Sequence, residues 1–389
     1  MKLLYLCRLC YRDWKHEGKM EWHPHRKTSL ILLIFLQNAT SISAQGKNEN
    51  NFLTFSASYV GEGFANFSGG IKTGLTYLGL VSLNTYFDAS KAHLWEGGGF
   101  FLSLYNTHGG TPAADFVGDY QGVSNIEAGN HTYLYELWYA QKFRKVKGII
   151  GMQDLNVNYA ASQYGNSFIN SSFGIPSTFA YNISSPIFPL TALGFHLEWQ
   201  PTEHFRWKAA IFDGTPEGLE NFHLKWKLNK QDGFLNITEI EYTKNWKENH
   251  SVSYKICAYF YNSQDSLSKS QKNGGFYLVA DQTINEHIGI FSQIAVSPSS
   301  KNSNPVYAGL GLNYKGIISK RQKDILGLAV AYAGLKDRAD ETALEIMYHF
   351  IINEHIRLIP DFQYIINPAG QDIALKNSLV GFLRMRFDF

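Results

Sequence analysis

The sequence predicts an all-β protein, a transmembrane antiparallel β-barrel of sixteen strands with long external loops and short periplasmic turns. Three observations support this fold class: sixteen strand-like segments, connections that alternate between long and short, and apolar residues at every second position of many segments. The last segment, 377–389, shows the alternation most clearly, because one face is apolar while the other becomes charged at Arg384 and Arg386. In a membrane barrel the apolar face contacts lipid and the charged face lines a wet lumen.

The amino-terminal region predicts a secretory signal peptide. Arg26 and Lys27 precede a short apolar run, and small residues follow up to Ala44. We therefore expect residues 1–44 to be the signal peptide and residues 45–389 to be a single barrel domain. Met20 fits as the true start, and an unusually long leader is the alternative. The apolar run is far shorter than the roughly 20 residues that a spanning helix needs.

Composition narrows the classes of function. Residues 1–44 hold seven of the 35 Lys and Arg and three of the 33 Asp and Glu, so the remaining chain carries a net charge of −2. This charge gives no reason to expect nucleic acid as a partner. Charged residues make up 17% of the chain, below the ~25% usual in soluble domains. Aromatic residues make up 15%, which suits girdles at two membrane interfaces.

Turn-rich pieces set the boundaries of the predicted strands. The strands are expected at 52–60, 72–87, 98–106, 131–143, 147–159, 191–200, 204–213, 233–243, 250–262, 274–283, 287–297, 305–315, 324–335, 341–352, 355–366 and 377–389. An even number of strands places both termini on the same side of the membrane, as bacterial outer-membrane barrels require.

The connections between these strands sort by length. Short links such as 144–146 and 201–203 follow even-numbered strands, whereas long polar links such as 107–130, 160–190 and 214–232 follow odd-numbered ones. Periplasmic turns and external loops of a barrel alternate in this way. A soluble β-sandwich also contains alternating strands, but it has no reason to sort its loops so regularly.

Alternation also assigns the faces of individual strands. Tyr133, Tyr135 and Leu137 are expected to face lipid, with Glu136 on the opposite, lumenal face. Pro360 falls on the apolar face of strand 355–366. Because proline cannot donate a hydrogen bond to a neighbouring strand, we expect a bulge or a missing bond there.

Six segments follow one another in a characteristic order. They are GNSFINSSFGIPSTFA at 165–180, AIFDGTP at 210–216, NPVYAGLGLNYKG at 304–316, DILGLAVAYA at 324–333, ETALEI at 341–346 and IPDFQYIINPAG at 359–370. In order and number they resemble the carbohydrate-selective porins of the OprB family, and the resemblance extends from about Leu75 to Phe389. The resemblance implies a single sixteen-stranded barrel that lets sugars cross the bacterial outer membrane passively.

Polar side chains on the lumenal strand faces are the candidate sugar path. They are Glu136, Asp154, Asn156, His196, Glu198, Arg357, Asp361, Gln363, Arg384 and Arg386. Carboxylate, amide and guanidinium groups can exchange hydrogen bonds to water for hydrogen bonds to sugar hydroxyls. The alternative for each residue is a structural role, in which it solvates the lumen or pairs with a neighbour to stiffen the wall.

The longest external connection, 160–190, is the candidate constriction loop. Loops of this length are uncommon unless they are functional. We expect it to fold into the barrel and narrow it, with Asn170, Phe173 and Phe179 near the constriction. The alternative is a lid packed over the mouth.

The sequence gives little support for an enzymatic function. Two carboxylate pairs, Glu239 with Glu241 and Glu136 with Asp154, could suggest glycosidase chemistry, but acidic residues are expected all round a polar lumen. The strand of Glu239 and Glu241 could turn either face inward. The histidines lack metal-ligand spacing, and neither a phosphate-binding loop nor a nucleophile elbow is present. We therefore predict a channel that is not an enzyme, with no cofactor and no metal site.

The predicted function is passive diffusion of small sugars. One alternative is a general or anion-preferring porin that acts through Arg357, Arg384 and Arg386. A less favoured one is an outer-membrane barrel hydrolase. Expected partners are outer-membrane lipid and the barrel-assembly machinery, which would recognise the strand ending at Phe389. The sequence leaves both a monomer and a homotrimer open.

Overall fold

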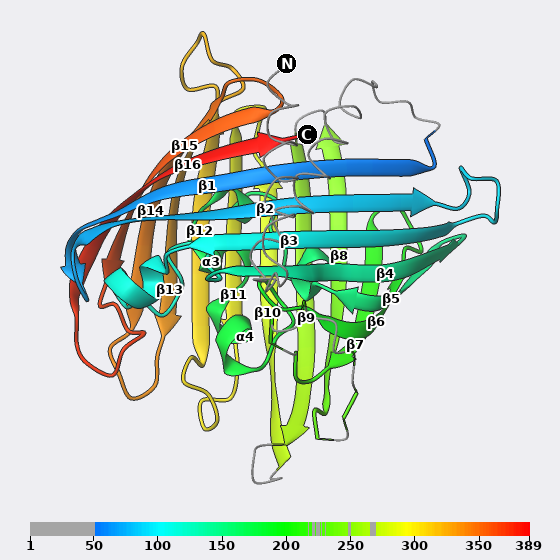
Figure 1. Cartoon of the computed structure of the whole chain (residues 1–389), viewed down its shortest axis with the longest axis horizontal. Helices are drawn as coiled ribbons and strands as arrows, with labels where there is room; N and C mark the ends of the chain where they lie inside the picture. Colours follow the sequence, from blue (N-terminus) through cyan, green and yellow to red (C-terminus); the bar gives the residue numbers. More distant parts are fainter. Residues whose placement is uncertain are drawn as a thin grey trace, which may run out of the picture. The chain divides into compact units, whose positions relative to one another are not determined.

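The computed structural model describes residues 51–389 apart from 217, 220–221, 223–225, 227, 230, 248–249 and 265–269. The expected signal peptide, residues 1–44, and the candidate start at Met20 lie outside the described residues. The described residues form a closed antiparallel barrel, in which each strand pairs with its neighbours in sequence and β1 pairs with β16 (Figure 1). Strands of opposite walls cross one another in this view because barrel strands are tilted. No helix in these ranges is long and apolar enough to span a membrane.

The strands of the described part of the chain number sixteen, as the sequence predicts. Their bounds are β1 Leu53–Gly70, β2 Gly74–Asp88, β3 Gly98–Gly109, β4 His131–Phe143, β5 Val146–Gln153, β6 Ala192–Trp199, β7 Phe205–Asp213, β8 Phe234–Lys247, β9 His250–Gln264, β10 Ser270–Thr283, β11 Ile288–Val296, β12 Val306–Lys315, β13 Ile325–Gly334, β14 Glu341–Ile351, β15 Ile356–Ile366 and β16 Lys376–Asp388. Most bounds agree with the predictions to within a few residues, and the largest differences are at the ends of β1 and β5.

The strand β1 continues ten residues beyond its predicted end at 60. Its second half contains Gly61 and Gly63, and glycine weakens the local signal for a strand. Pairing with β2 on one side and β16 on the other overrides this local weakness.

The strand β5 ends six residues before its predicted end at 159. The Asp154 side chain accepts a hydrogen bond from the Asn156 backbone N–H at 2.8 Å and so caps a short 3-10 helix, η2 Leu155–Val157. The prediction that Asp154 and Asn156 are strand residues is therefore wrong. Both belong to the beginning of the connection between β5 and β6.

A β-bulge in β4 overturns the predicted lipid-facing positions of Tyr133 and Tyr135. Consecutive residues of β3 pair with Leu134 and Glu136, so Tyr135 is the extra residue on β4. The bulge shifts the alternation by one position. Tyr133 and Tyr135 consequently share the inner face with Glu136, and both rings are buried.

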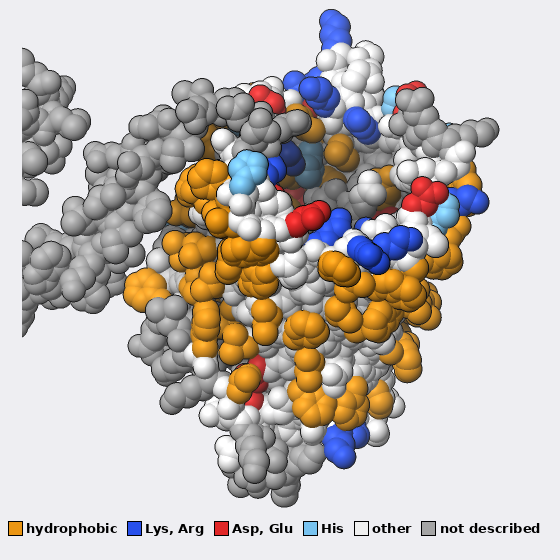
Figure 2. Space-filling model, turned by 90° about the vertical axis from the view of Figure 1, so that its right-hand side faces the viewer, with side chains coloured by type: hydrophobic (Ala, Val, Ile, Leu, Met, Phe, Trp, Pro, Cys, Tyr) orange, Lys and Arg blue, Asp and Glu red, His pale blue; other side chains and the backbone are white. Residues whose placement is uncertain are grey.

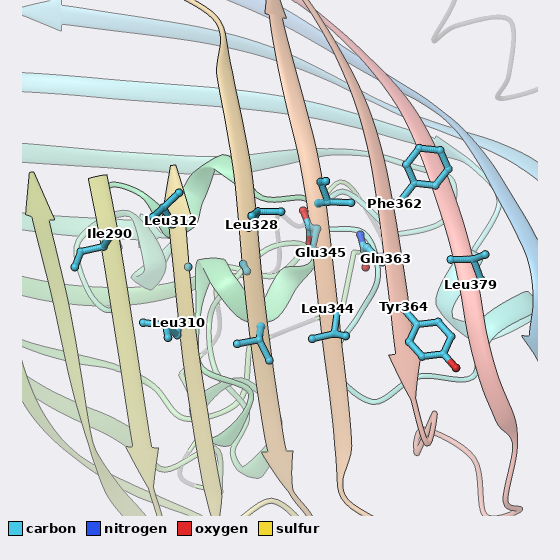
Figure 3. A pocket seen from close by; sticks show the side chains of 14 residues that line it. Ile290, Leu310, Leu312, Leu328, Leu344, Glu345, Phe362, Gln363, Tyr364 and Leu379 are labelled. Atoms are coloured by element: carbon cyan, nitrogen blue, oxygen red, sulfur yellow. The ribbon is translucent and has the colours of Figure 1, made fainter. Parts of the chain in front are cut away.

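Apolar side chains cover the outside of the barrel, as predicted, whereas the inside carries the charged side chains together with buried apolar ones, such as Phe64 and Phe291, that pack against the loops. In β16 the outward Leu383 and Met385 are 51% and 42% exposed, whereas Arg384 between them is only 9% exposed. Figure 2 shows hydrophobic side chains gathered on the outer wall and charged side chains around an opening. Figure 3 shows the same division in β14 and β15, where Leu344 and Phe362 line an apolar groove on the outer wall.

Pro360 interrupts the hydrogen-bonded pairing of β14 and β15. The pairs run to Met347 opposite Asp361 and resume only at Phe350 opposite Leu358. This gap is the missing pairing that the proline predicts. On its other side, Pro360 keeps its register with β16.

Aromatic rings gather on the outer rim near the turn between β2 and β3. The ring of Phe100 lies 6.2 Å from Phe87 and 4.8 Å from Tyr139. The Trp95 indole N–H donates a hydrogen bond to the Tyr139 hydroxyl at 3.2 Å. Such rings, apolar in body with a polar tip, have the composition expected of a girdle at a membrane interface.

Candidate functional site

Two long connections enter the barrel interior and define its open space. We call them loop 110–130, between β3 and β4, and loop 154–191, between β5 and β6. Their short helices are η1 Ala113–Val117, η2 Leu155–Val157, η3 Gly165–Ser167, α3 Ser171–Gly174 and α4 Ser177–Asn182 (Figure 1). Residues facing inward from the strands hold both loops in place.

The middle of loop 154–191 is attached to β14 and β15. The Glu345 carboxylate accepts hydrogen bonds from the backbone N–H groups of Ile169 and Asn170 at 2.6 and 3.0 Å. The Asn170 side chain donates to Gln363 at 3.2 Å. Because Glu345 and Gln363 point into the barrel from adjacent strands, this part of the loop lies inside the cylinder.

The beginning of loop 154–191 is attached to β8 and β10. The Ala160 backbone N–H donates to Glu239 at 3.1 Å, and the Tyr277 hydroxyl donates to the same carboxylate at 2.6 Å. The Ser162 hydroxyl donates to Asp281 at 2.6 Å. Glu239 is fully buried against this loop, so its side chain faces inward. The face of β8 that turns to the lumen, which the sequence left open, is therefore the one that carries Glu239.

The three predicted constriction residues are packed within this loop. Asn170, Phe173 and Phe179 have no exposed surface. Phe173 lies against the rings of Phe168 and Phe291, with centroids 5.1 and 5.9 Å apart, and Phe179 lies 4.7 Å from Tyr259. They position the loop and offer no surface of their own to a solute.

Loop 110–130 is attached near the seam where β1 meets β16. Glu62 of β1 accepts a hydrogen bond from the Ser124 hydroxyl at 2.7 Å and pairs with Arg384 of β16. Arg384 also donates to the Asn125 side chain at 2.6 Å. Earlier in the loop, the Glu341 carboxylate of β14 accepts hydrogen bonds from the backbone N–H groups of residues 120 and 121.

Burial within this loop affects its acidic groups. Burial raises the pKa of Glu127 to about 7, and hydrogen bonds from the backbone N–H groups of Ala113 and Ala114 oppose the rise. Burial also holds the pKa of Asp119 well above its ordinary value, and the Glu341 charge adds to that rise. Both groups therefore take up a proton at higher pH in the folded loop than free carboxyl groups do.

Most of the ten predicted lumen residues are covered by the loops. Those no more than 9% exposed are Glu136, Asp154, His196, Asp361, Gln363 and Arg384. Asn156 is partly exposed and donates to the carbonyl groups of Tyr159 and Gly174. The side chains of Glu198, Arg357 and Arg386 retain 24%, 41% and 44% of their exposure. The residues accessible to water from this set are thus chiefly these last three.

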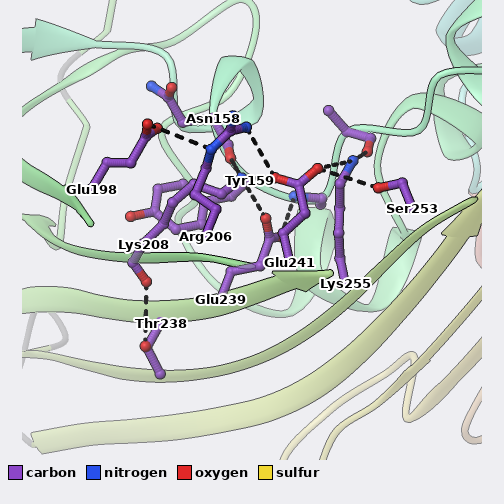
Figure 4. A network of polar contacts seen from close by, with 12 residues as sticks. Asn158, Tyr159, Glu198, Arg206, Lys208, Thr238, Glu239, Glu241, Ser253 and Lys255 are labelled. Atoms are coloured by element: carbon purple, nitrogen blue, oxygen red, sulfur yellow. Dashed lines mark hydrogen bonds and ion pairs between the residues drawn. The ribbon is translucent and has the colours of Figure 1, made fainter. Parts of the chain in front are cut away.

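An ion-pair network that the sequence did not predict crosses β6 to β9 (Figure 4). Arg206 lies 3.5 Å from Glu198 and 3.2 Å from Glu241, and Lys208 lies 2.6 Å from Glu239. Lys208 also donates to the carbonyl of Asn158 in loop 154–191 at 2.6 Å. Glu239 and Glu241, one of the two carboxylate pairs considered for glycosidase chemistry, are thus both bound by cations. The alternating Arg-Trp-Lys of β7 could have revealed inward positions at 206 and 208.

Partly exposed residues on the inner face of β2–β4 mark another part of the open lumen. They are Asn84, Tyr86, Phe101, Tyr105 and Trp138. None of the five belongs to the predicted sugar path, although alternation within strand 131–143 places Trp138 on the lumenal face with Glu136. In the described part of the chain no cluster of His, Cys, Asp and Glu side chains is arranged to hold a metal ion.

A closed barrel that is apolar outside and polar inside, with loops folded into its lumen, is the architecture of a diffusion porin. A family model described as "Carbohydrate-selective porin, OprB family" matches residues 72–389. The chain belongs to this family, and it is an outer-membrane porin for passive diffusion of carbohydrates. The family and the fold are those of channels rather than enzymes, and they confirm the predicted resemblance.

Individual relatives agree with this assignment. Porin B of Pseudomonas aeruginosa is 22% identical over 406 residues, covering 86% of this chain and 87% of that protein. The high-pH structure of Pseudomonas putida OprB matches with a TM-score of 0.78 and 20% identity, covering 87% of this chain and 94% of the other. The low-pH structure of the same protein matches with a TM-score of 0.59 and 18% identity, covering 87% and 92%.

Proposed function

We propose that small sugars cross this barrel through the space that loops 110–130 and 154–191 leave along the inner wall. The observation that carries the proposal is the attachment of loop 154–191 to inward carboxylates, above all Glu345 and Glu239. A loop held at several points has a fixed position, so the width of the open space is fixed as well. Fixed width would limit passage by solute size, and the exposed polar groups would replace water around the sugar hydroxyls.

Liposome swelling in a series of mono-, di- and trisaccharides tests the role of loop 154–191. Wild type is expected to pass monosaccharides faster than the larger sugars. Deletion of residues 165–180 is expected to reduce this size dependence, because it removes η3, α3 and part of α4. Unchanged size dependence in a folded deletion variant would rule out the constriction role. Retained electrophoretic heat-modifiability would show that the variant barrel is folded.

A weak preference for anions is a second candidate property. Of the three arginines considered for it, Arg384 is neutralised by Glu62. Arg357 and Arg386 share one carboxylate, that of Asp388, at 3.9 and 2.9 Å. This leaves one uncompensated positive charge in the group. A reversal potential measured across a salt gradient would reveal the preference, and Arg386→Gln is expected to reduce it.

The surroundings of the barrel complete the proposal. We infer that outer-membrane lipid covers the apolar outer wall and that the barrel-assembly machinery recognises β16 and Phe389. Phe389 is 66% exposed next to that strand and is therefore accessible to a partner. Removal of Phe389 is expected to lower the amount of folded barrel in the outer membrane, measured by heat-modifiability of membrane fractions.

A further inference from the structure

Three aromatic residues lie side by side on the inner wall of β2–β4. Tyr86 pairs with Phe101, and Phe101 pairs with Trp138, so the three form one row across adjacent strands. Directly paired residues share a face of the sheet. Tyr86 is also paired with Thr54 of β1. Thr54 and the inward Glu62 are eight residues apart on the same strand, so both side chains are on the inner face. The row therefore faces the lumen.

The rings of this row are close to one another and remain partly exposed. The Phe101 and Trp138 ring centroids are 4.9 Å apart with an interplanar angle of 25°, and Tyr86 lies 6.5 Å from Trp138. Gly99 makes room for the row, because a Cβ at this position would come within 2.2 Å of the Tyr86 hydroxyl. All three residues keep some surface accessible to water.

A second aromatic group continues along the same wall. Tyr105, four residues along β3 from Phe101, is about 13 Å away at the usual rise of a strand. Its ring stacks on Tyr135 with centroids 4.0 Å apart and an angle of 14°. Phe188 of loop 154–191 lies 6.3 Å from Tyr105. The bulge in β4 is what brings Tyr135 to this inner face.

Polar groups separate the two aromatic groups. Ser103 and Asn84 lie between them, and the Ser103 hydroxyl donates to the Asn84 side chain at 2.7 Å. The Asn84 amide group donates only a long hydrogen bond, 3.4 Å, to Ser56. Ser103 is buried, whereas Asn84 is partly exposed and its amide group can therefore exchange hydrogen bonds with a passing solute.

We propose that Tyr86, Phe101 and Trp138, followed by Tyr105, form an aromatic strip on which pyranose rings stack as they pass. A pyranose is amphipathic: its C–H groups form apolar faces, while its hydroxyl groups project around the rim. The apolar face loses contact with water against an aromatic ring, and the rim hydroxyls reach the Asn84 side chain. An open-chain polyol of similar size has the hydroxyls but no rigid apolar face. The strip thus selects ring-form sugars, an inference that rests on the proposed sugar passage.

The burial pattern favours this use over a purely structural one. A porin interior is normally polar, so apolar rings partly exposed to lumenal water lose stability unless a solute covers them. By contrast, rings that only pack, such as Phe168 and Phe173 in loop 154–191, are fully buried. The exposed rings of the strip therefore suit a transient partner.

Sugar block of the ion current in planar bilayers tests the strip, with glucose and sorbitol as the cyclic and open-chain probes. Trp138→Leu is expected to raise the half-blocking concentration of glucose about five-fold, equivalent to ~1 kcal/mol, with little effect on sorbitol. Trp138→Phe keeps a ring and is expected to retain most of the block. Trp199→Leu is the matched control, because Trp199 lies on the outer face of β6 and is 46% exposed.

Two results would contradict the proposal that sugars stack on the aromatic strip. One is glucose block that is unchanged in Trp138→Leu, and the other is an equal loss of block by glucose and sorbitol, which would indicate only a change of pore shape. If Trp138→Leu does not insert as a folded barrel, Tyr86→Leu and Phe101→Leu apply the same test. Failure of wild type to pass any sugar into liposomes would instead contradict the proposed sugar passage itself.

Discussion

Arg384 of the last strand and Glu62 of the first strand form a buried ion pair across the seam that closes the barrel. The same two side chains bind Asn125 and Ser124, so loop 110–130 is attached at the seam. This pair of charges therefore strengthens the seam between β1 and β16 and also helps to hold loop 110–130 in place.

Removal of Arg384 should destabilise the barrel strongly. Arg384→Ala leaves the Glu62 carboxylate buried without its cation, and breaking a buried pair typically costs about 3–5 kcal/mol. Unfolding by urea in detergent micelles, followed by tryptophan fluorescence, measures the change. Arg386→Ala is the control, because Arg386 is exposed and its ion pair should contribute about 1 kcal/mol or less. Equal losses in the two variants would contradict the structural role of the seam pair.

Removal of Glu345 should loosen loop 154–191. Glu345→Ala deletes the acceptor of two backbone N–H groups, those of Ile169 and Asn170. The open-channel current is then expected to become noisier and larger, because the loop can move away from β14. Single-channel recording checks this. Glu286→Ala, in the exposed turn before β11, is the matched control and should conduct like wild type. A quiet Glu345→Ala channel of wild-type conductance would show that the loop does not depend on this anchor.

The local stability of loop 110–130 should fall as pH rises from about 4.5 to about 7. The folded pKa of Glu127 is raised to about 7 by burial, so in this window the folded loop binds more protons than the unfolded loop. The free energy of opening therefore decreases with pH through the window, and the raised pKa of Asp119, about 8, in the same loop adds to the decrease. Hydrogen exchange at the amides of Ala113 and Ala114, corrected for intrinsic rates, measures the opening. Glu127→Gln is expected to reduce the pH dependence, and a protection that rises with pH in wild type would contradict the account.

The two cations of β7 should contribute very differently to stability. Lys208→Met leaves the fully buried Glu239 without its nearest cation and should cost about 3–5 kcal/mol. Arg206→Met removes a partly exposed ion pair with Glu198, whose loss should lower the free energy of unfolding by about 1 kcal/mol or less. The same substitution also removes the ion pair of Arg206 with Glu241. Urea unfolding of both variants compares them. The double variant Lys208→Met/Glu239→Gln should recover much of the loss, and no recovery would show that Lys208 acts through packing instead.

Local alternation in the sequence was enough to predict the number of strands and most of their faces. The prediction from alternation failed where a strand ends or contains a bulge although its residues still alternate. Residues 154–159, Asp-Leu-Asn-Val-Asn-Tyr, alternate like the residues of a strand. The Asp154 side chain nevertheless caps a short helix and accepts a hydrogen bond from the Tyr135 hydroxyl at 2.6 Å. The bulge at Tyr135 could not be predicted either, because one extra residue does not visibly change the pattern of apolar and polar residues along the strand.

The candidate site was harder to predict than the fold. The length of the connection after β5 pointed to an inward loop, but its anchors pair residues far apart in sequence, such as Ile169 with Glu345. Such pairs follow only from the closed barrel. Alternation placed Trp138 on the lumenal face with Glu136, but the lumenal aromatics were left out of the predicted sugar path, because an aromatic residue in a membrane strand fits the lipid interface equally well. The inward positions of Tyr86 and Phe101 follow from the register of β2–β4.

The central claim is that this barrel conducts sugars through a pore narrowed by its own loops. The most direct measurement is the ion current through single wild-type channels in a planar bilayer, recorded with and without a monosaccharide on one side. The account predicts a concentration-dependent, saturable reduction of the current by the sugar, together with at most weak ion selectivity. A current that is unaffected by sugar but strongly selective for anions would contradict it.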